Sequence, residues 1–150
     1  MMKLPCALLV MSAAACVSAP ALAALGGDAR SVESDRAVLK GVLHVTPMVE
    51  YDLHEIRTES GTVIHEYVSP QGKVFAVSWH GPGRPDLAQL LGSYSAQLAQ
   101  AAPRTHYNHH HFRVVSPDAV LESDFHLRTL SGRAWVPALL PQSFASSNIG

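Results

Sequence analysis

Three runs of strand-forming residues, separated by turn-forming residues, constrain the fold of this chain more than any other feature. The runs are YDLHEIRT (51–58), TVIHEYVS (62–69) and KVFAVSWH (73–80). Between them lie Glu-Ser-Gly (59–61) and Pro-Gln-Gly (70–72). Glycine at the end of a three-residue loop supplies the left-handed conformation that this hairpin type needs. The pattern predicts three antiparallel strands in a β-meander.

The loop lengths also predict a strand register. Three-residue loops set the following pairs opposite one another: Leu53 with Tyr67, Glu55 with His65, Val63 with Trp79, His65 with Val77, and Tyr67 with Phe75. This register gathers aromatic and aliphatic residues on one face, as a half-buried sheet requires. A two-residue first loop sets Glu55 against Glu66 instead, which is a pair of like charges. We therefore expect His65 on the apolar face with Glu55 as its hydrogen-bonding partner.

The segment that follows the meander predicts one main amphipathic helix. Pro85 suits the first residue of a helix, and apolar residues then recur at helical spacing. These residues are Leu87, Leu90, Leu91, Tyr94 and Leu98. We expect them to cover the sheet face that carries Phe75 and Trp79.

The remaining segments complete an α+β fold. Residues 31–40 predict a short helix that Ser31 can cap, and residues 112–116 predict a fourth strand. Residues 125–130 and 133–140 predict a hairpin that turns at Ser131-Gly132. The expected architecture is an antiparallel β-meander covered by one main amphipathic helix, plus a C-terminal β-hairpin.

The first residues have the layout of a secretory signal. Lys3 precedes an uncharged apolar run, and Ala21-Leu22-Ala23 offers small residues to a signal peptidase. We expect a signal peptide over 1–23, a single domain over 24–141 and a disordered tail over 142–150. The expected location is the periplasm or the extracellular medium, with no transmembrane segment after cleavage. Cys6 and Cys16 lie inside the signal, so cysteine chemistry is not expected in the mature chain.

Charge and motifs exclude several classes of protein. The formal net charge is −1 and no basic stripe appears, so nucleic acid is not an expected partner. Gly-x-Ser-x-Gly and the His-Glu-x-x-His zinc-protease motif are both absent from the sequence. Four carboxylates are candidate acids or bases, namely Glu55, Glu66, Asp86 and Asp124. Their alternative role is structural, as surface charges or, for Asp86, as a favourable charge at a helix N-terminus.

HYNHHH, positions 106–111, is the chain's one cluster of metal-ligating residues. His106 and His110 share a face of a helix, whereas His109 and His111 share a face of a strand. Either pair offers imidazoles to Zn²⁺ or Cu²⁺. No carboxylate lies within the cluster, and a solvated connection that binds metal weakly explains its composition equally well.

Two long stretches carry a resemblance to a known family. The first contains Gly61-Thr62, Glu66 to Val68, Gly72 to Val77, Trp79, Gly81-Pro82 and Pro85 to Tyr94. The second contains His126, Arg128, Gly132 to Ala134 and Pro137. They resemble an uncharacterised family of exported proteobacterial proteins that is catalogued as a domain of unknown function. The resemblance implies an exported protein of one domain and implies no activity.

Three functions therefore compete. The leading hypothesis is a small, exported, non-enzymatic protein that acts by binding an envelope protein or another ligand, without a cofactor. The first alternative is a periplasmic transition-metal-binding protein that uses His106, His109, His110 and His111. The second alternative is a hydrolase whose site is assembled from distant residues, which requires a cleft where Glu or Asp meets His.

Overall fold

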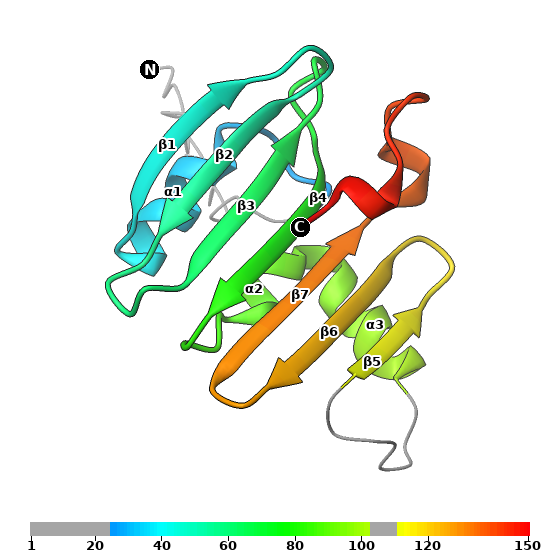
Figure 1. Cartoon of the computed structure of the whole chain (residues 1–150). Helices are drawn as coiled ribbons and strands as arrows, with labels where there is room; N and C mark the ends of the chain where they lie inside the picture. Colours follow the sequence, from blue (N-terminus) through cyan, green and yellow to red (C-terminus); the bar gives the residue numbers. More distant parts are fainter. Residues whose placement is uncertain (1–24, 103–110) are drawn as a thin grey trace, which may run out of the picture.

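The structure is a computed structural model, and it describes residues 25–102 and 111–150. The predicted signal peptide and three of the four clustered histidines lie outside these residues. Seven strands form one antiparallel sheet in the order β1-β2-β3-β4-β7-β6-β5 (Figure 1). The strands are β1 (Val42–Pro47), β2 (Asp52–Arg57), β3 (Val63–Val68), β4 (Val74–Gly81), β5 (His111–Val115), β6 (Val120–His126) and β7 (Thr129–Trp135).

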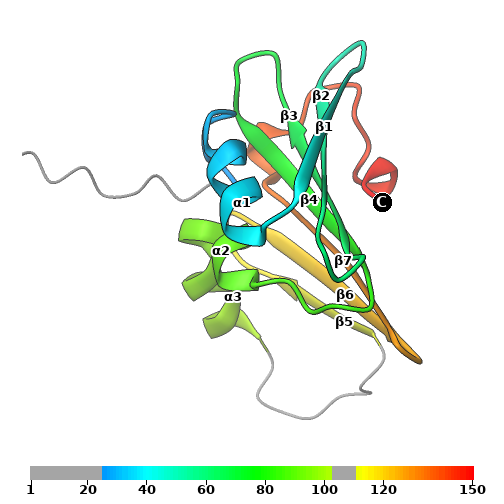
Figure 2. The ribbon, with the colours of Figure 1, turned by 90° about the vertical axis from the view of Figure 1, so that its left-hand side faces the viewer.

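The α-helices lie on one face of this sheet, which we call the inner face (Figure 2). The α-helices are α1 (Ser31–Leu39), α2 (Leu87–Leu91) and α3 (Ser95–Ala101), and the 3-10 turns are η1 (Gly92–Tyr94), η2 (Pro137–Leu139) and η3 (Ser146–Asn148). Within the described residues no helix is long and apolar enough to cross a membrane. The chain therefore has the predicted α+β fold with an antiparallel meander.

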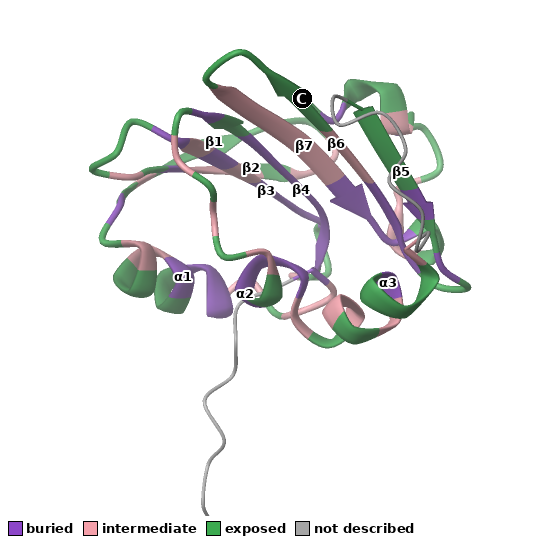
Figure 3. Ribbon diagram, turned by 90° about the horizontal axis from the view of Figure 1, so that it is seen from below, coloured by how far each residue is buried: buried purple, intermediate pink, exposed green. Residues whose placement is uncertain are grey.

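Each face of the sheet has its own apolar cluster, because strand side chains alternate between the faces. The inner cluster includes Ile56, Ile64 and Trp79 from the strands and Leu90 and Leu98 from the helices. The opposite, outer face is covered over part of its area by the C-terminal segment, residues 137–150 (Figure 2). Figure 3 shows the buried positions concentrated in the central strands and on the sheet side of the helices.

The first hairpin of the meander has the predicted register. Glu55 lies opposite His65 and Leu53 opposite Tyr67. Gly61 and Gly72, the last residues of the two three-residue loops, have φ of 84° and 74°. This left-handed conformation is the reason for glycine at both positions.

The second hairpin of the meander departs from the predicted register by one residue. His65 lies opposite Ser78, not Val77, and the register shifts between Tyr67 and Val68. A β-bulge explains the shift, since an extra residue on one strand reverses the facing of all residues beyond it. Phe75 consequently joins the outer cluster while Trp79 joins the inner one. The prediction that one helix covers both rings is wrong.

The predicted single helix over 85–101 is two short helices separated by the 3-10 turn η1. The break occurs at Gly92, which has φ of 50° and follows the last residue of α2. Asp86 caps α2, and its carboxylate accepts from the backbone N–H groups of Ala88 and Gln89. The structural alternative for Asp86 is thus confirmed. Ser31 does not cap α1, because Arg30 is the N-cap and makes no side-chain capping bond.

Two further C-terminal predictions are corrected. The hairpin of β6 and β7 turns at Leu127 and Arg128, because Ser131 and Gly132 lie within β7 and pair with β6. The tail over 142–150, predicted to be disordered, packs on the outer face. Phe144 and Ile149 are buried there, which gives an otherwise polar segment the apolar contacts that hold it.

Candidate functional site: a groove on the outer sheet face

A groove of about 540 Å³ lies on the outer face beside the C-terminal segment. Its size falls in the usual range of ligand sites. The residues that line it come from the six strands β2 to β7 and from the C-terminal segment: Glu55, Arg57, Val63, His65, Ser78, Trp79, His80, His111, Glu122, Asp124, Ser131, Gly132, Arg133, Ile149 and Gly150. We call this feature the outer groove.

The floor of the outer groove consists of small side chains on the two central strands. Ser78 of β4 lies opposite Arg133 of β7, and His80 lies opposite Ser131. Since adjacent strands are only about 4.8 Å apart, two serines between longer neighbours leave a depression in the sheet surface. The hollow is thus a direct result of the small residues at positions 78 and 131.

One wall of the groove is a three-residue network on β2 and β3. The Glu55 carboxylate accepts from Arg57 Nε at 3.0 Å and lies 3.2 Å from His65 Nε2. The hydrogen bond to His65, together with Arg57, lowers the pKa of Glu55 despite partial burial. The predicted pairing of Glu55 with His65 is confirmed, and it faces the groove.

The opposite wall is centred on Glu122 and Arg133. Arg133 Nε lies 2.7 Å from Glu122 Oε2, and Arg113 Nε lies 3.3 Å from Glu122 Oε1. Arg133 also lies over the Trp135 ring, with 5.7 Å from Cζ to the ring centroid. Both carboxylate oxygens of Glu122 are therefore paired, and most N–H donors of the Arg133 guanidinium are engaged. Arg133 is therefore a fixed part of the wall and not a free cation.

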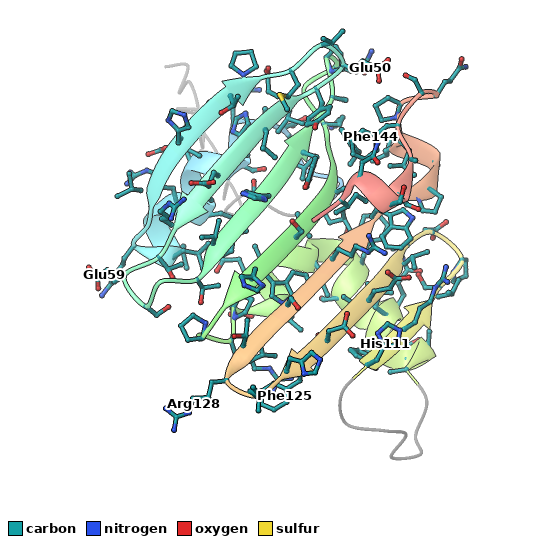
Figure 4. All side chains as sticks on the ribbon, in the orientation of Figure 1. Glu50, Glu59, His111, Phe125, Arg128 and Phe144 are labelled. Atoms are coloured by element: carbon teal, nitrogen blue, oxygen red, sulfur yellow. The ribbon has the colours of Figure 1, made fainter. Side chains whose placement is uncertain are left out.

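His111 lies at the β5 edge of the same face (Figure 4) and is the one residue of the histidine cluster that the structure describes. Its Nδ1 is 2.6 Å from Asp124 Oδ1, which leaves Nε2 available. His106, His109 and His110 lie outside the described residues, so the predicted metal site remains a prediction. Among the described residues, no group of three or more His, Cys, Asp or Glu side chains is placed to hold a metal ion.

The chain's own C-terminal segment is bound at one end of the groove. Arg133 Nη1 donates to the carbonyl oxygens of Ser146 and Ile149, at 3.3 and 3.1 Å. The Tyr67 hydroxyl donates to the Gly150 carbonyl at 3.2 Å and accepts from the Gly150 N–H at 3.1 Å. All four contacts are to main-chain atoms. At these positions the outer face therefore holds the C-terminal segment through its main-chain atoms.

Apolar pockets beside these contacts receive two side chains of the same segment. The Phe144 ring packs edge-on against Tyr51 and Phe75, with centroid distances of 5.2 and 5.1 Å. Ile149 is buried in the same cluster. Ser143 adds a hydrogen bond to the Glu50 carboxylate. The segment was predicted to be disordered, although one aromatic and one aliphatic residue in a polar tail are a signal of docking.

Of the four candidate acids, Glu55 and Asp124 reach the groove and Glu66 and Asp86 do not. Glu66 is wholly buried on the inner face, between Ile64 and Val68. There it meets Asp35 of α1, which sequence analysis did not single out. The alternation of apolar residues at 64 and 68 around Glu66 was the available signal.

A family model described as a protein of unknown function (DUF2844) matches residues 21–149 of the chain. No curated protein and no solved structure matches.

Proposed function

The chain belongs to the DUF2844 family, whose function is unknown, and from the outer groove we propose that it is an exported, non-enzymatic protein that binds an extended polypeptide segment of a partner. The groove is the proposed binding site. We infer a polypeptide partner because the outer face already binds residues 144–150 of the chain itself.

One observation carries this proposal. The outer face binds residues 144–150 through main-chain hydrogen bonds from Arg133 and Tyr67 and through apolar pockets for Phe144 and Ile149. Ile149 and Gly150 also line the groove, so the unfilled space continues from the bound segment. Hydrogen bonds to the main chain of a peptide, combined with pockets for selected side chains, are a recurring means of binding an extended peptide.

The free polar groups of the groove suit an uncharged backbone. Glu55 and Glu122 are each neutralised by arginine, and Arg133 is saturated. The remaining groups include the hydroxyls of Ser78 and Ser131 and the ring of His80, which both donate and accept hydrogen bonds. A strongly anionic ligand gains little here, because it must compete with the carboxylates already in place.

Site-specific photo-crosslinking tests the proposal. A photoreactive phenylalanine analogue at Val63, which lines the groove, should crosslink to a discrete polypeptide in cells. The matched control places the same analogue at Val49, which is fully exposed in the β1–β2 turn. Ser131→Trp, which fills the floor, should abolish the Val63 crosslink and leave the fold intact. Equal crosslinking from Val63 and Val49 contradicts a groove-specific partner.

A hydrolase is the second candidate, since Glu55, His65 and Ser78 follow one another on three neighbouring strands. Within the described residues no hydrogen bond joins Ser78 to His65. The N–H groups of central strands are also used by the sheet itself, which disfavours an oxyanion hole there. Ser78→Ala discriminates the two functions: it should abolish ester hydrolysis if Ser78 is a nucleophile, whereas it should only weaken partner binding, because it removes one of several groove hydrogen bonds.

Metal binding is favoured by one contact, the hydrogen bond from His111 to Asp124, because metal-bound histidines are usually oriented by a carboxylate. We propose weak binding that does not set the fold. Calorimetry with Zn²⁺ and Cu²⁺ should show low affinity, which is lost when His106, His109, His110 and His111 are changed to Ala. His80→Ala is the control. Tight 1:1 binding with a large rise in melting temperature contradicts weak binding.

We propose export on the basis of the N-terminal sequence, with cleavage after Ala23. The intact mass of protein recovered from the periplasm or medium should correspond to a chain that begins at Ala24. A lipid adduct at Cys16 contradicts this processing.

A further inference from the structure

A pair of buried acids joins α1 to the inner face of the sheet. Asp35 of α1 and Glu66 of β3 are both completely inaccessible to solvent. The Gln89 amide of α2 donates to Asp35 Oδ1 at 2.6 Å. Asp35 Oδ2 and both Glu66 oxygens have no hydrogen-bond partner apart from one another. Two carboxylates in this setting are not both ionised, because buried charge without a counter-charge is very costly.

No basic group compensates the pair within the described residues. On β2, His54 lies opposite Glu66, and burial lowers its pKa and leaves its Nδ1 unpartnered. On β4, the residue opposite Glu66 is Val77. The neighbouring charges on the helices are engaged elsewhere: Glu33 pairs with Arg36 on the exposed side of α1, and Asp86 caps α2. A proton shared by Asp35 and Glu66 relieves their repulsion without any other charged group.

We propose that a proton shared by Asp35 and Glu66 holds α1 on the sheet, so that α1 is released as the pH rises. The shared proton converts two repelling acceptors into a donor and an acceptor. The contact then bridges α1 and β3, and Gln89 extends it to α2. When the proton leaves, the charge is relieved by separating α1 from the sheet and hydrating both carboxylates.

The direction of the pH effect follows from the raised pKa values of Asp35 and Glu66. Burial raises the pKa of Asp35 to about 6 from its ordinary 3.8, and burial and Asp35 raise the pKa of Glu66 well above 4.5. A raised pKa in the folded state gives stability that is fully present below the unfolded pKa. That stability is lost as the pH rises through about 6 and beyond. The α1 contact is thus strong in acid and weak in alkali.

The Asp35–Glu66 pair, which we call the latch, also lies directly behind the outer groove. Glu66 is the inward residue of β3 between His65 and Tyr67, which face outward. Release of α1 removes the inner support of this strand. Any effect on ligand binding is a further consequence, and the latch does not depend on the peptide-binding function.

Hydrogen exchange of the α1 amides in the full chain between pH 6 and 9 tests the latch. After correction for the intrinsic rate, exchange in α1 should accelerate by up to about tenfold per pH unit, since one bound proton is lost on opening. The α3 amides serve as an internal reference. Wild-type α1 exchange that follows the intrinsic rate alone overturns the proposal.

Glu66→Gln supplies the decisive variant, because it keeps the shape of the side chain and removes its ionisation. The extra pH dependence of α1 exchange should disappear in this variant. Glu33→Gln, an exposed change on the same helix, should retain it. If Glu66→Gln does not fold, Asp35→Asn serves in its place and should likewise reduce the pH dependence. A pH dependence unchanged in the folded variant rejects the latch.

Discussion

Glu55 has three roles at once: it orients His65, it neutralises Arg57 and it forms one wall of the outer groove. Its side chain retains 26% exposure. Water therefore screens part of each interaction, and the pair contributes less than a fully buried one. Removal of Glu55 still leaves His65, which is also partly buried, without its partner.

We expect Glu55→Ala to lower the free energy of unfolding by about 1 kcal/mol, near the lower end for orphaning a polar group. Glu55→Gln should cost less, because its amide can still bond His65. Since the pKa of Glu55 is lowered in the folded state, the difference from wild type should shrink as the pH falls below about 4. Urea unfolding at several pH values measures this, with Glu59→Ala in the adjoining turn as the control. A neutral Glu55→Ala contradicts the structural role.

For single residues, the sequence predicts the contacts that depend on loop length or on position at a helix terminus. Loop length determined the pairing of Glu55 with His65, and Asp86 was recognisable as a charge at a helix start. Glu66 was missed as a core residue, although the apolar residues Ile64 and Val68 flank it at alternate positions. The predicted apolar face contained His65. Because neighbouring strand residues point to opposite faces, Glu66 was assigned to the solvent face. Both faces of this sheet are covered in part. Simple alternation of apolar and polar residues assumes one buried face and one solvent face, so it does not predict a sheet that is buried on both sides.

Among the elements, the C-terminal segment depends most on a few residues. Phe144 provides its aromatic contact, and its ring packs against three others: Tyr51, Tyr67 and Phe75. The regular structure described in the segment is limited to two short 3-10 turns, η2 and η3. Its attachment therefore comes from packing and from Arg133, and not from regular structure.

We expect Phe144→Ala to destabilise the protein by about 3 kcal/mol, the usual cost of removing a buried phenylalanine. The variant should also bind a hydrophobic dye more strongly, because Tyr67 and Phe75 lose their cover. Thermal unfolding and dye fluorescence measure the two effects. Gln142→Ala, an exposed change in the same segment, should alter neither. If Phe144→Ala unfolds like wild type, the segment does not contribute to the core.

Element boundaries show where sequence patterns stop being informative. The helical periodicity over 85–98 was real, but Gly92 divides it, and a glycine inside a periodic run is ambiguous from sequence alone. The Ser-Gly pair at 131–132 has turn-forming composition, yet it lies in β7. Gly132 is required there because a Cβ atom would lie 2.3 Å from Trp79 Cζ2. That reason is tertiary and has no local signal.

The whole molecule is built from two antiparallel units joined through the pairing of β4 with β7. Neither strand is near the other in sequence, so no loop rule predicts their contact. This arrangement leaves β1 and β5 as the edges of the sheet (Figure 1). The β5 edge carries Arg113, whereas β1 contains no charged residue. Uncharged edge strands are prone to pair with another chain.

We expect Val45→Lys on β1 to reduce self-association at high protein concentration, because a charged edge opposes strand pairing. Val45 is 43% exposed, so the substitution should leave the fold unchanged. Val115→Lys on β5 is the matched control and should have a smaller effect. Sedimentation velocity over a range of concentrations measures the association. A wild-type protein that remains monomeric throughout contradicts the expectation.

The two buried clusters also make the molecule suitable for optical study. The chain contains two tryptophans, and Trp79 belongs to the inner cluster while Trp135 belongs to the outer one. A variant with Trp135→Phe emits from beneath the helices, and a variant with Trp79→Phe emits from beneath the C-terminal segment. Emission spectra of these two proteins should therefore distinguish loss of the helical layer from loss of the C-terminal segment, a separation that circular dichroism of a mostly β-sheet protein does not provide.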